Sequence, residues 1–126
     1  MSLVLDAGAL VAVERADRHL IALIKQELLD GRAPLTHGGV VGQVWRGGAG
    51  RQALLARLLP ALDVAALDGA LGRRAGILLG RARMDDVIDA ALVLLAVDGD
   101  FLLTSDTSDL KPLAAVAGLH VDIVPV

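Results

Sequence analysis

The chain has 126 residues, of which 55% are hydrophobic, and its formal net charge is −3 at pH 7. This length suits one domain and is too short for two full ones, and a net acidic chain excludes a generally basic nucleic-acid-binding surface. The mean hydropathy of +0.62 does not indicate a membrane protein, because the longest unbroken apolar run, residues 90–97, is far shorter than the roughly 18 residues that a spanning helix needs.

The N-terminal segment MSLVLDAGAL has no basic region and holds Asp6 within its apolar stretch, which argues against a secretory signal. The absence of cysteine excludes a disulfide framework and a thiolate zinc site, and it fits a cytoplasmic protein. We therefore expect a single cytoplasmic domain without a membrane segment.

The first half of the chain alternates short apolar runs with segments of helical periodicity. Residues 3–6 (LVLD) predict a strand, and residues 7–31 carry apolar side chains at helical spacing up to a glycine stop. Residues 33–37 predict a second strand. Two helical pieces separated by glycines follow, at residues 38–48 and 51–62.

The second half continues the same alternation. Asp68 is expected to cap a helix over residues 69–81. Further strands are expected at residues 63–67, 101–105 and 120–126, and further helices at residues 85–97 and 106–117. Apolar strands that alternate with helices indicate an α/β domain with a parallel sheet.

Several aspartates fall where such a fold forms sites. Asp6 follows the first strand and Asp106 follows the strand at 101–105, so both belong at the carboxyl edge of the sheet. Asp86 and Asp89 share one face of a helix that begins nearby. Carboxylates about 4 Å apart repel by about 1 to 4 kcal/mol, and a divalent cation removes that cost. Oxygen ligands suit Mg²⁺, with Mn²⁺ as an alternative.

Each of these acids also has a purely structural interpretation. Asp85 is expected to be the N-cap of the helix that follows it, and the helix dipole favours acids in a first turn. Of the two acids in SDTSDL, Asp109 is expected to cap the last helix and Asp106 to remain a ligand. Asp89 interrupts an apolar pattern, and burying it without a partner would be expensive.

The ordered set VLDAGALVAV, VWRGG, DDVIDAALVLLA and LLTSDTSDL resembles a PIN domain, specifically the VapC toxin branch of type II toxin–antitoxin systems, over essentially the whole chain. The resemblance implies a single PIN-like domain over residues 1–126, with a parallel sheet of four or five strands flanked by helices. It also implies a metal-dependent ribonuclease that forms a homodimer. A cognate VapB-type antitoxin would inhibit it by reaching across the site with its C-terminal segment.

The resemblance assigns the site position by position. Its catalytic residues would be Asp6, Asp86 and Asp106. Its metal ligands would be these three together with Asp89 and Asp109. One or two Mg²⁺ ions held there would lower the pKa of a bound water and stabilise the leaving oxygen during hydrolysis of an RNA phosphodiester bond.

One position departs from the family pattern. The second family acid, normally a glutamate on the helix before WRGG, falls at Gln43. A metal would then be held more weakly unless Asp89 supplies the missing carboxylate. Thr104 and Ser105 are expected to orient Asp106 or a bound water, or simply to form hydrogen bonds at the strand end.

Other polar and aromatic residues have expected places around the pocket. Arg46, Arg81 and Arg83 are expected to contact RNA phosphates beside an acidic pocket that alone would repel RNA. His37 is expected to be a polar loop residue. Trp45 fits core or interface packing better than base stacking.

Other function classes make different demands on the same residues. A haloacid-dehalogenase phosphatase needs a second aspartate two positions after Asp6, where the chain has Gly8. A response-regulator receiver needs a lysine late in the sheet, and Lys111 is poorly placed for that role. The stronger alternative is a PIN-like module that binds RNA or a protein partner without cleavage, and Gln43 favours it.

Overall fold

The computed structural model describes residues 1–126, which form a five-stranded sheet in the order β3-β2-β1-β4-β5. All four pairings are parallel. The strands are β1 (Leu3–Leu5), β2 (Leu35–His37), β3 (Asp63–Ala65), β4 (Phe101–Thr104) and β5 (Asp122–Pro125). The α/β class and the parallel sheet predicted from the alternating pattern are confirmed.

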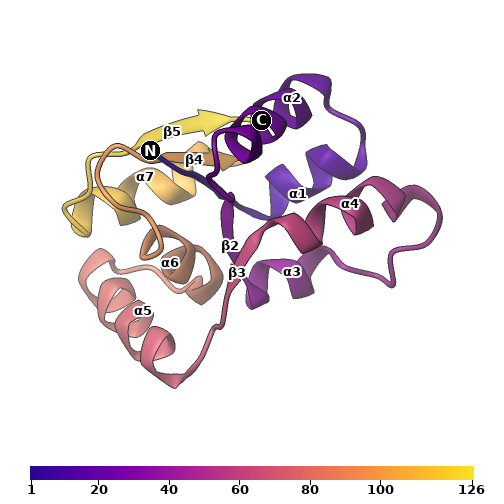
Figure 1. Ribbon diagram of the computed structural model, residues 1–126. Helices are drawn as coiled ribbons and strands as arrows, with labels where there is room; N and C mark the ends of the chain where they lie inside the picture. Colours follow the sequence, from indigo (N-terminus) through magenta and orange to yellow (C-terminus); the bar gives the residue numbers. More distant parts are fainter.

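Parallel strands need crossover connections, and seven α-helices supply them. They are α1 (Ala7–Glu14), α2 (Arg18–Leu29), α3 (Gly38–Val44), α4 (Ala53–Leu58), α5 (Gly69–Ala82), α6 (Val87–Val93) and α7 (Thr107–Val116). In Figure 1, α5, α6 and α7 lie together on one side of the sheet, while α1 to α4 lie on the other. None of these helices is long and apolar enough to cross a membrane.

The core sits on both faces of the central strands. Every residue of β1 is buried, because helices cover the strand from both sides. Residues 90–93 of α6 are also wholly buried. This burial explains why the sequence of α6 is apolar nearly all round.

The single helix expected over residues 7–31 is wrong, because the chain forms two helices there. Ala16 adopts a left-handed backbone conformation with φ of 61°. Asp17 then begins α2 by accepting a hydrogen bond from the backbone N–H of Leu20 at 3.1 Å. The helical spacing of apolar residues continues across this break, so the periodicity alone concealed it.

Candidate functional site at the carboxyl edge of the sheet

A pocket of about 210 Å³ lies where β1 and β4 end. It gathers side chains from four separate segments, and no lysine or arginine lines it. The polar lining residues are Asp6, Gln43, Asp86, Asp89, Thr104, Ser105, Asp106 and Asp109. Aspartates that are far apart in the sequence therefore line one pocket.

Three of the aspartates are helix N-caps, and the three helices begin at this pocket. Asp6 begins α1 and Asp86 begins α6, and each accepts a hydrogen bond from the backbone N–H three residues on, at 2.8 and 3.1 Å. Asp106 begins α7 and accepts from the backbone N–H two residues on, at 3.1 Å. The positive ends of three helix dipoles thus offset part of the repulsion between the carboxylates.

The structure corrects two of the expected caps. Asp86, not Asp85, caps α6, and Asp106, not Asp109, caps α7. In both cases the cap is the last residue with extended backbone before the helix, so its side chain is the one that reaches the free N–H groups of the first turn. Capping therefore accounts locally for Asp86 and Asp106, but it does not explain why the capped ends meet.

The pKa of Asp89 reflects the burial of its carboxyl and the charges of the other aspartates in the pocket. It lies in the first turn of α6 and is half-buried. Burial is the main cause that raises the pKa of its carboxyl to about 6, and the charges of Asp86, Asp109, Asp6 and Asp106 contribute in the same direction. The charges of the other four aspartates therefore reach Asp89, and ionising Asp89 costs free energy.

Asp106 and Asp109 are shifted in opposite directions. The hydroxyl of Ser108 donates to Asp106 Oδ1 at 2.6 Å, and this bond is the main cause that lowers the pKa of Asp106. The charge of Asp106 in turn raises the pKa of Asp109. Thr104, which is buried at the end of β4, accepts a hydrogen bond from the backbone N–H of Asp106 at 2.9 Å and so fixes the turn that carries it.

Gln43 and Ser105 complete the polar lining. Gln43 is exposed on α3, and its side chain makes no hydrogen bond, so its amide is free to bind a ligand. Ser105 lies directly against Gly8 in the first turn of α1, where an added Cβ would be 2.1 Å from Ser105 Oγ. Only glycine therefore allows α1 to begin this close to Ser105, a constraint that was not predicted from the sequence.

The three arginines expected beside the pocket do not line it. The Arg46 guanidinium donates to two backbone carbonyls of its own segment. Arg81 lines a different pocket with Leu94 and Ala117, where α6 and α7 end, which places it at the opposite ends of those helices from the carboxylates. Arg83 ends α5 in a left-handed conformation. Their contact with RNA stays a prediction.

His37 and Trp45 both have structural places. His37 is completely buried, not a loop residue. Its Nδ1 accepts from the backbone N–H of Gly39 at 3.1 Å, so its Nε2–H donates to the carbonyl of Ile88 at 2.9 Å and ties α3 to α6 beside the pocket. Trp45 packs against the core, and Gly48 lies close to its ring. Nothing in the sequence signals the buried histidine.

Gln52 is a further residue whose role was not predicted from the sequence. It is buried, and its Oε1 accepts hydrogen bonds from the backbone N–H groups of Arg46 and Gly48 at 2.8 and 3.1 Å. Its Nε2 donates to Glu14 at 2.6 Å and to the carbonyl of Val44 at 2.9 Å. The glycine-rich segment after α3 is therefore pinned to the end of α1.

The donors of the pocket suit a hard divalent cation. Carboxylate and amide oxygens are the ligands that Mg²⁺ and Mn²⁺ prefer, and a cation would relieve the repulsion that contributes to the raised pKa of Asp89. As the side chains stand, no three of the His, Cys, Asp and Glu residues are close enough to hold one ion. Coordination therefore requires the carboxylates to turn inward, and Asp6 and Asp86 each keep one oxygen free of hydrogen bonds for this.

Comparison with known proteins establishes the fold. No family model and no curated protein matches the sequence. The structure is similar to a chain in the crystal structure of VapBC2 from Rickettsia felis bound to a DNA fragment from their promoter, with a TM-score of 0.70 over 98% of each chain. Only 12% of the aligned residues are identical, so the likeness concerns the fold. It confirms the PIN-like α/β fold expected from the sequence.

Proposed function

We propose that this protein is a VapC-type toxin, a metal-dependent ribonuclease that hydrolyses RNA phosphodiester bonds. One observation carries the proposal: five aspartates and the N-termini of three helices meet in one pocket, where burial and their combined charge raise the pKa of Asp89. Repulsion between these carboxylates destabilises the metal-free pocket, and a bound cation would offset it. The similarity of the fold to a chain of the VapBC2 structure supports the same proposal.

In the proposed reaction, Asp6, Asp86 and Asp106 would hold one or two Mg²⁺ ions once their carboxylates turn inward, with Asp89 and Asp109 as further ligands. When bound there, the cation would supply an activated water and electrostatic stabilisation of the scissile phosphate. The helix caps hold Asp6, Asp86 and Asp106 at fixed backbone positions. The N-termini of α1, α6 and α7 add positive potential toward the phosphate.

Metal removal tests this proposal. We expect the purified protein to cleave labelled single-stranded RNA in Mg²⁺ or Mn²⁺, to lose that activity in EDTA and to regain it when the metal is restored. An Asp106→Asn variant purified in the same way controls for a contaminating nuclease. Cleavage that persists in EDTA would contradict the metal-dependent mechanism. RNA binding without cleavage in any divalent metal would favour the non-cleaving module, for which Gln43 is the supporting observation.

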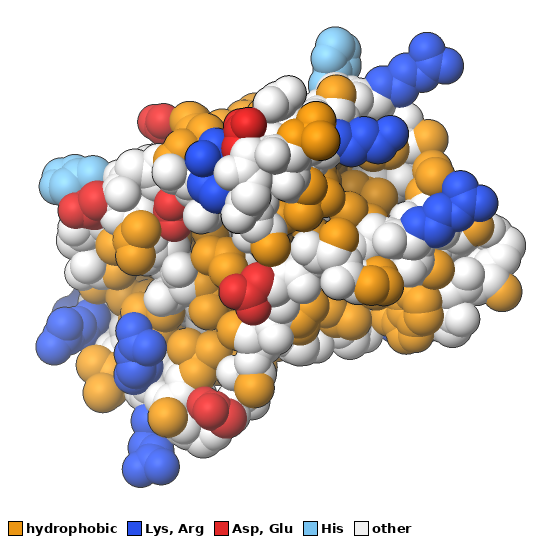
Figure 2. Space-filling model, viewed as in Figure 1, with side chains coloured by type: hydrophobic (Ala, Val, Ile, Leu, Met, Phe, Trp, Pro, Cys, Tyr) orange, Lys and Arg blue, Asp and Glu red, His pale blue; other side chains and the backbone are white.

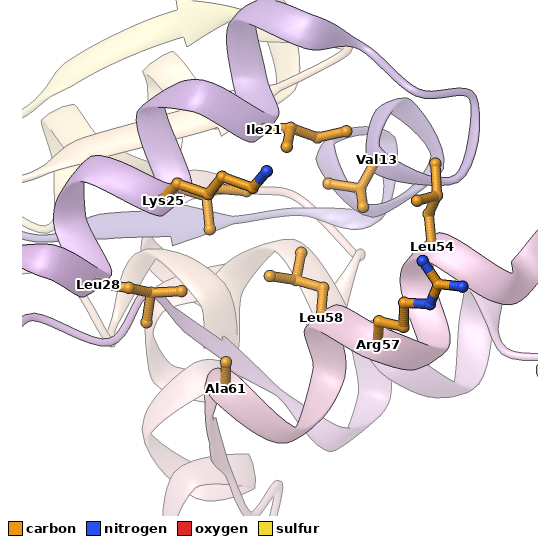
Figure 3. Close-up of a pocket in the computed structure, with 9 residues that line it drawn as sticks. Val13, Ile21, Lys25, Leu28, Leu54, Arg57, Leu58 and Ala61 are labelled. Carbon is orange, nitrogen blue, oxygen red and sulfur yellow. The ribbon is translucent and has the colours of Figure 1, made fainter.

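We further propose a VapB-type antitoxin as a partner, since the similar structure is that of a VapBC2 complex. An apolar groove of about 290 Å³ between α1, α2 and α4 offers a surface for it (Figure 3). The apolar lining comprises Val13, Ile21, Ile24, Leu28, Leu54, Leu58 and Ala61, and Lys25 and Arg57 also line the groove. Figure 2 shows apolar side chains exposed between α2 and α4 with cationic side chains at their border. This pattern fits a helix with an apolar face and acidic flanks.

The groove proposal predicts a separation of inhibition from catalysis. Leu54 is 37% exposed within the groove, so Leu54→Asp places a charge on the contact surface without emptying the core. We expect this variant to cleave RNA at the wild-type rate but to resist a co-purified antitoxin in the cleavage assay. Leu29→Asp is the matched control, because Leu29 is 82% exposed on α2 and lies outside the groove. Equal inhibition of both variants would place the antitoxin elsewhere.

A further inference from the structure

The acidic pocket adjoins a second, larger hollow of about 550 Å³. The two share four lining residues, which are Ala7, Gly8, Gln43 and Ser105. The second hollow is lined in addition by Val11, Ala12, Arg15, Asp17, Val44 and Val126. Because the shared residues form a common boundary, the two hollows make one groove that continues from the carboxylates along α1.

The groove runs the length of α1. It begins at Asp6, the N-cap of the helix, and ends at Arg15, its C-cap. At 1.5 Å per residue this distance along the helix axis is about 14 Å. The opposite wall is formed by the end of α3 at Gln43 and Val44 and by Ser105. A ligand in this groove would therefore touch the acidic pocket with one part and Arg15 with another.

Arg15 is the only lysine or arginine that lines either part of the groove. Its side chain is exposed and forms neither an ion pair nor a hydrogen bond. Asp17 lines the same end, but its carboxylate already accepts a hydrogen bond from the backbone N–H of Leu20 as the cap of α2. Arg15 is thus an unpaired cation at the far end of a groove whose other end is strongly acidic.

We propose that Arg15 binds a phosphate of the RNA strand near the scissile one, and that the intervening nucleotides lie along α1 in the groove. This inference rests on the proposed ribonuclease function. A guanidinium binds phosphate oxygens in a bidentate manner, and a cation set apart from the metal site would fix the register of the strand. The apolar walls at Val11, Ala12 and Val44 offer contact for an unpaired base or ribose, so the substrate segment is single-stranded.

RNA binding tests this inference without depending on cleavage. A fluorescent single-stranded RNA oligonucleotide is titrated, at several salt concentrations, onto Asp6→Asn protein with and without Arg15→Ala. We expect Arg15→Ala to weaken binding about 10-fold and to reduce the slope of log affinity against log salt by about 0.7. Arg18→Ala is the control, because Arg18 is exposed on the next helix and lines neither part of the groove.

Cleavage kinetics provide the second readout. In the active protein, Arg15→Ala should raise KM about 10-fold with little change in kcat, and Arg15→Lys should recover part of that loss. An unchanged affinity and salt slope in Arg15→Ala would overturn the inference, as would equal binding of a duplex RNA. If no variant cleaves RNA but binding still depends on Arg15, the proposed nuclease function fails and the assignment of Arg15 stands.

Discussion

Replacing Asp6 by asparagine is expected to slow RNA cleavage by about 100-fold or more while leaving the fold intact. The large effect follows because a metal ion supplies several kcal/mol of charge stabilisation in the transition state, and each 1.36 kcal/mol is a factor of about ten in rate. The small structural effect follows because asparagine is as good an N-cap as aspartate. The asparagine side chain would still accept the hydrogen bond from the backbone N–H of Ala9 that begins α1.

The chain contains a matched control for this substitution. Asp68 caps α5 by accepting a hydrogen bond from the backbone N–H of Leu71 at 2.9 Å, and it lies outside the acidic pocket. Asp68→Asn should therefore keep its helix cap, as Asp6→Asn does, but leave the cleavage rate unchanged. Single-turnover cleavage, Mg²⁺ calorimetry and thermal denaturation on both variants provide the comparison. A wild-type cleavage rate in Asp6→Asn would mean that Asp6 serves only as a helix cap and has no part in catalysis.

The central strands β1 and β4 could be predicted because burial on both faces leaves a plain signal. β1 and β4 are short, continuous apolar runs, and parallel strands place the residues that follow them at one edge. The sequence alone therefore predicts that Asp6 and Asp106 lie at the same edge of the sheet. The break between α1 and α2 left no comparable signal, because the apolar spacing continues across Ala16.

The finer assignments failed where they depended on tertiary structure. Composition cannot tell Asp85 from Asp86 as the cap of α6, because the cap is decided by the residue at which the extended backbone turns helical. The burial of His37 depends on α6 packing over β2, and the position of Arg81 depends on the direction of α5 relative to α6. The long-range arrangement of the helices decides each of these, and a local pattern does not contain it.

Asp89→Asn is expected to stabilise the metal-free protein at neutral pH. The pKa of Asp89 is raised from 3.8 to about 6 in the folded protein, so folding favours its protonated form. This contribution to stability is present below about pH 4 and is lost as the pH rises through about 6. The shift corresponds to at most about 3 kcal/mol, and screening of the half-exposed side chain reduces the expected gain from Asp89→Asn to about 1 kcal/mol.

Urea denaturation at a series of pH values measures this effect. The stability curves of wild type and Asp89→Asn should meet near pH ~4 and separate as the pH rises to neutrality, with the variant the more stable. Asp85→Asn is the control, since Asp85 is exposed and does not line the pocket. A variant that is less stable than wild type at neutral pH would mean that the carboxylate of Asp89 supports α6 structurally.

Asp89→Asn should also weaken metal binding, and a second substitution at Gln43 tests why. If Asp89 supplies the carboxylate that is missing at Gln43, Asp89→Asn should weaken Mg²⁺ binding and remove the stabilisation that Mg²⁺ gives to the wild type. Gln43→Glu in the Asp89→Asn background should then restore both, because both side chains line the same pocket. Failure of Gln43→Glu to restore binding would show that position 89 serves the metal in its own right. Asp89→Asn is thus expected to raise the stability of the metal-free protein and to weaken Mg²⁺ binding. Together these two results would mean that the carboxylate of Asp89 serves cation binding and does not stabilise the fold.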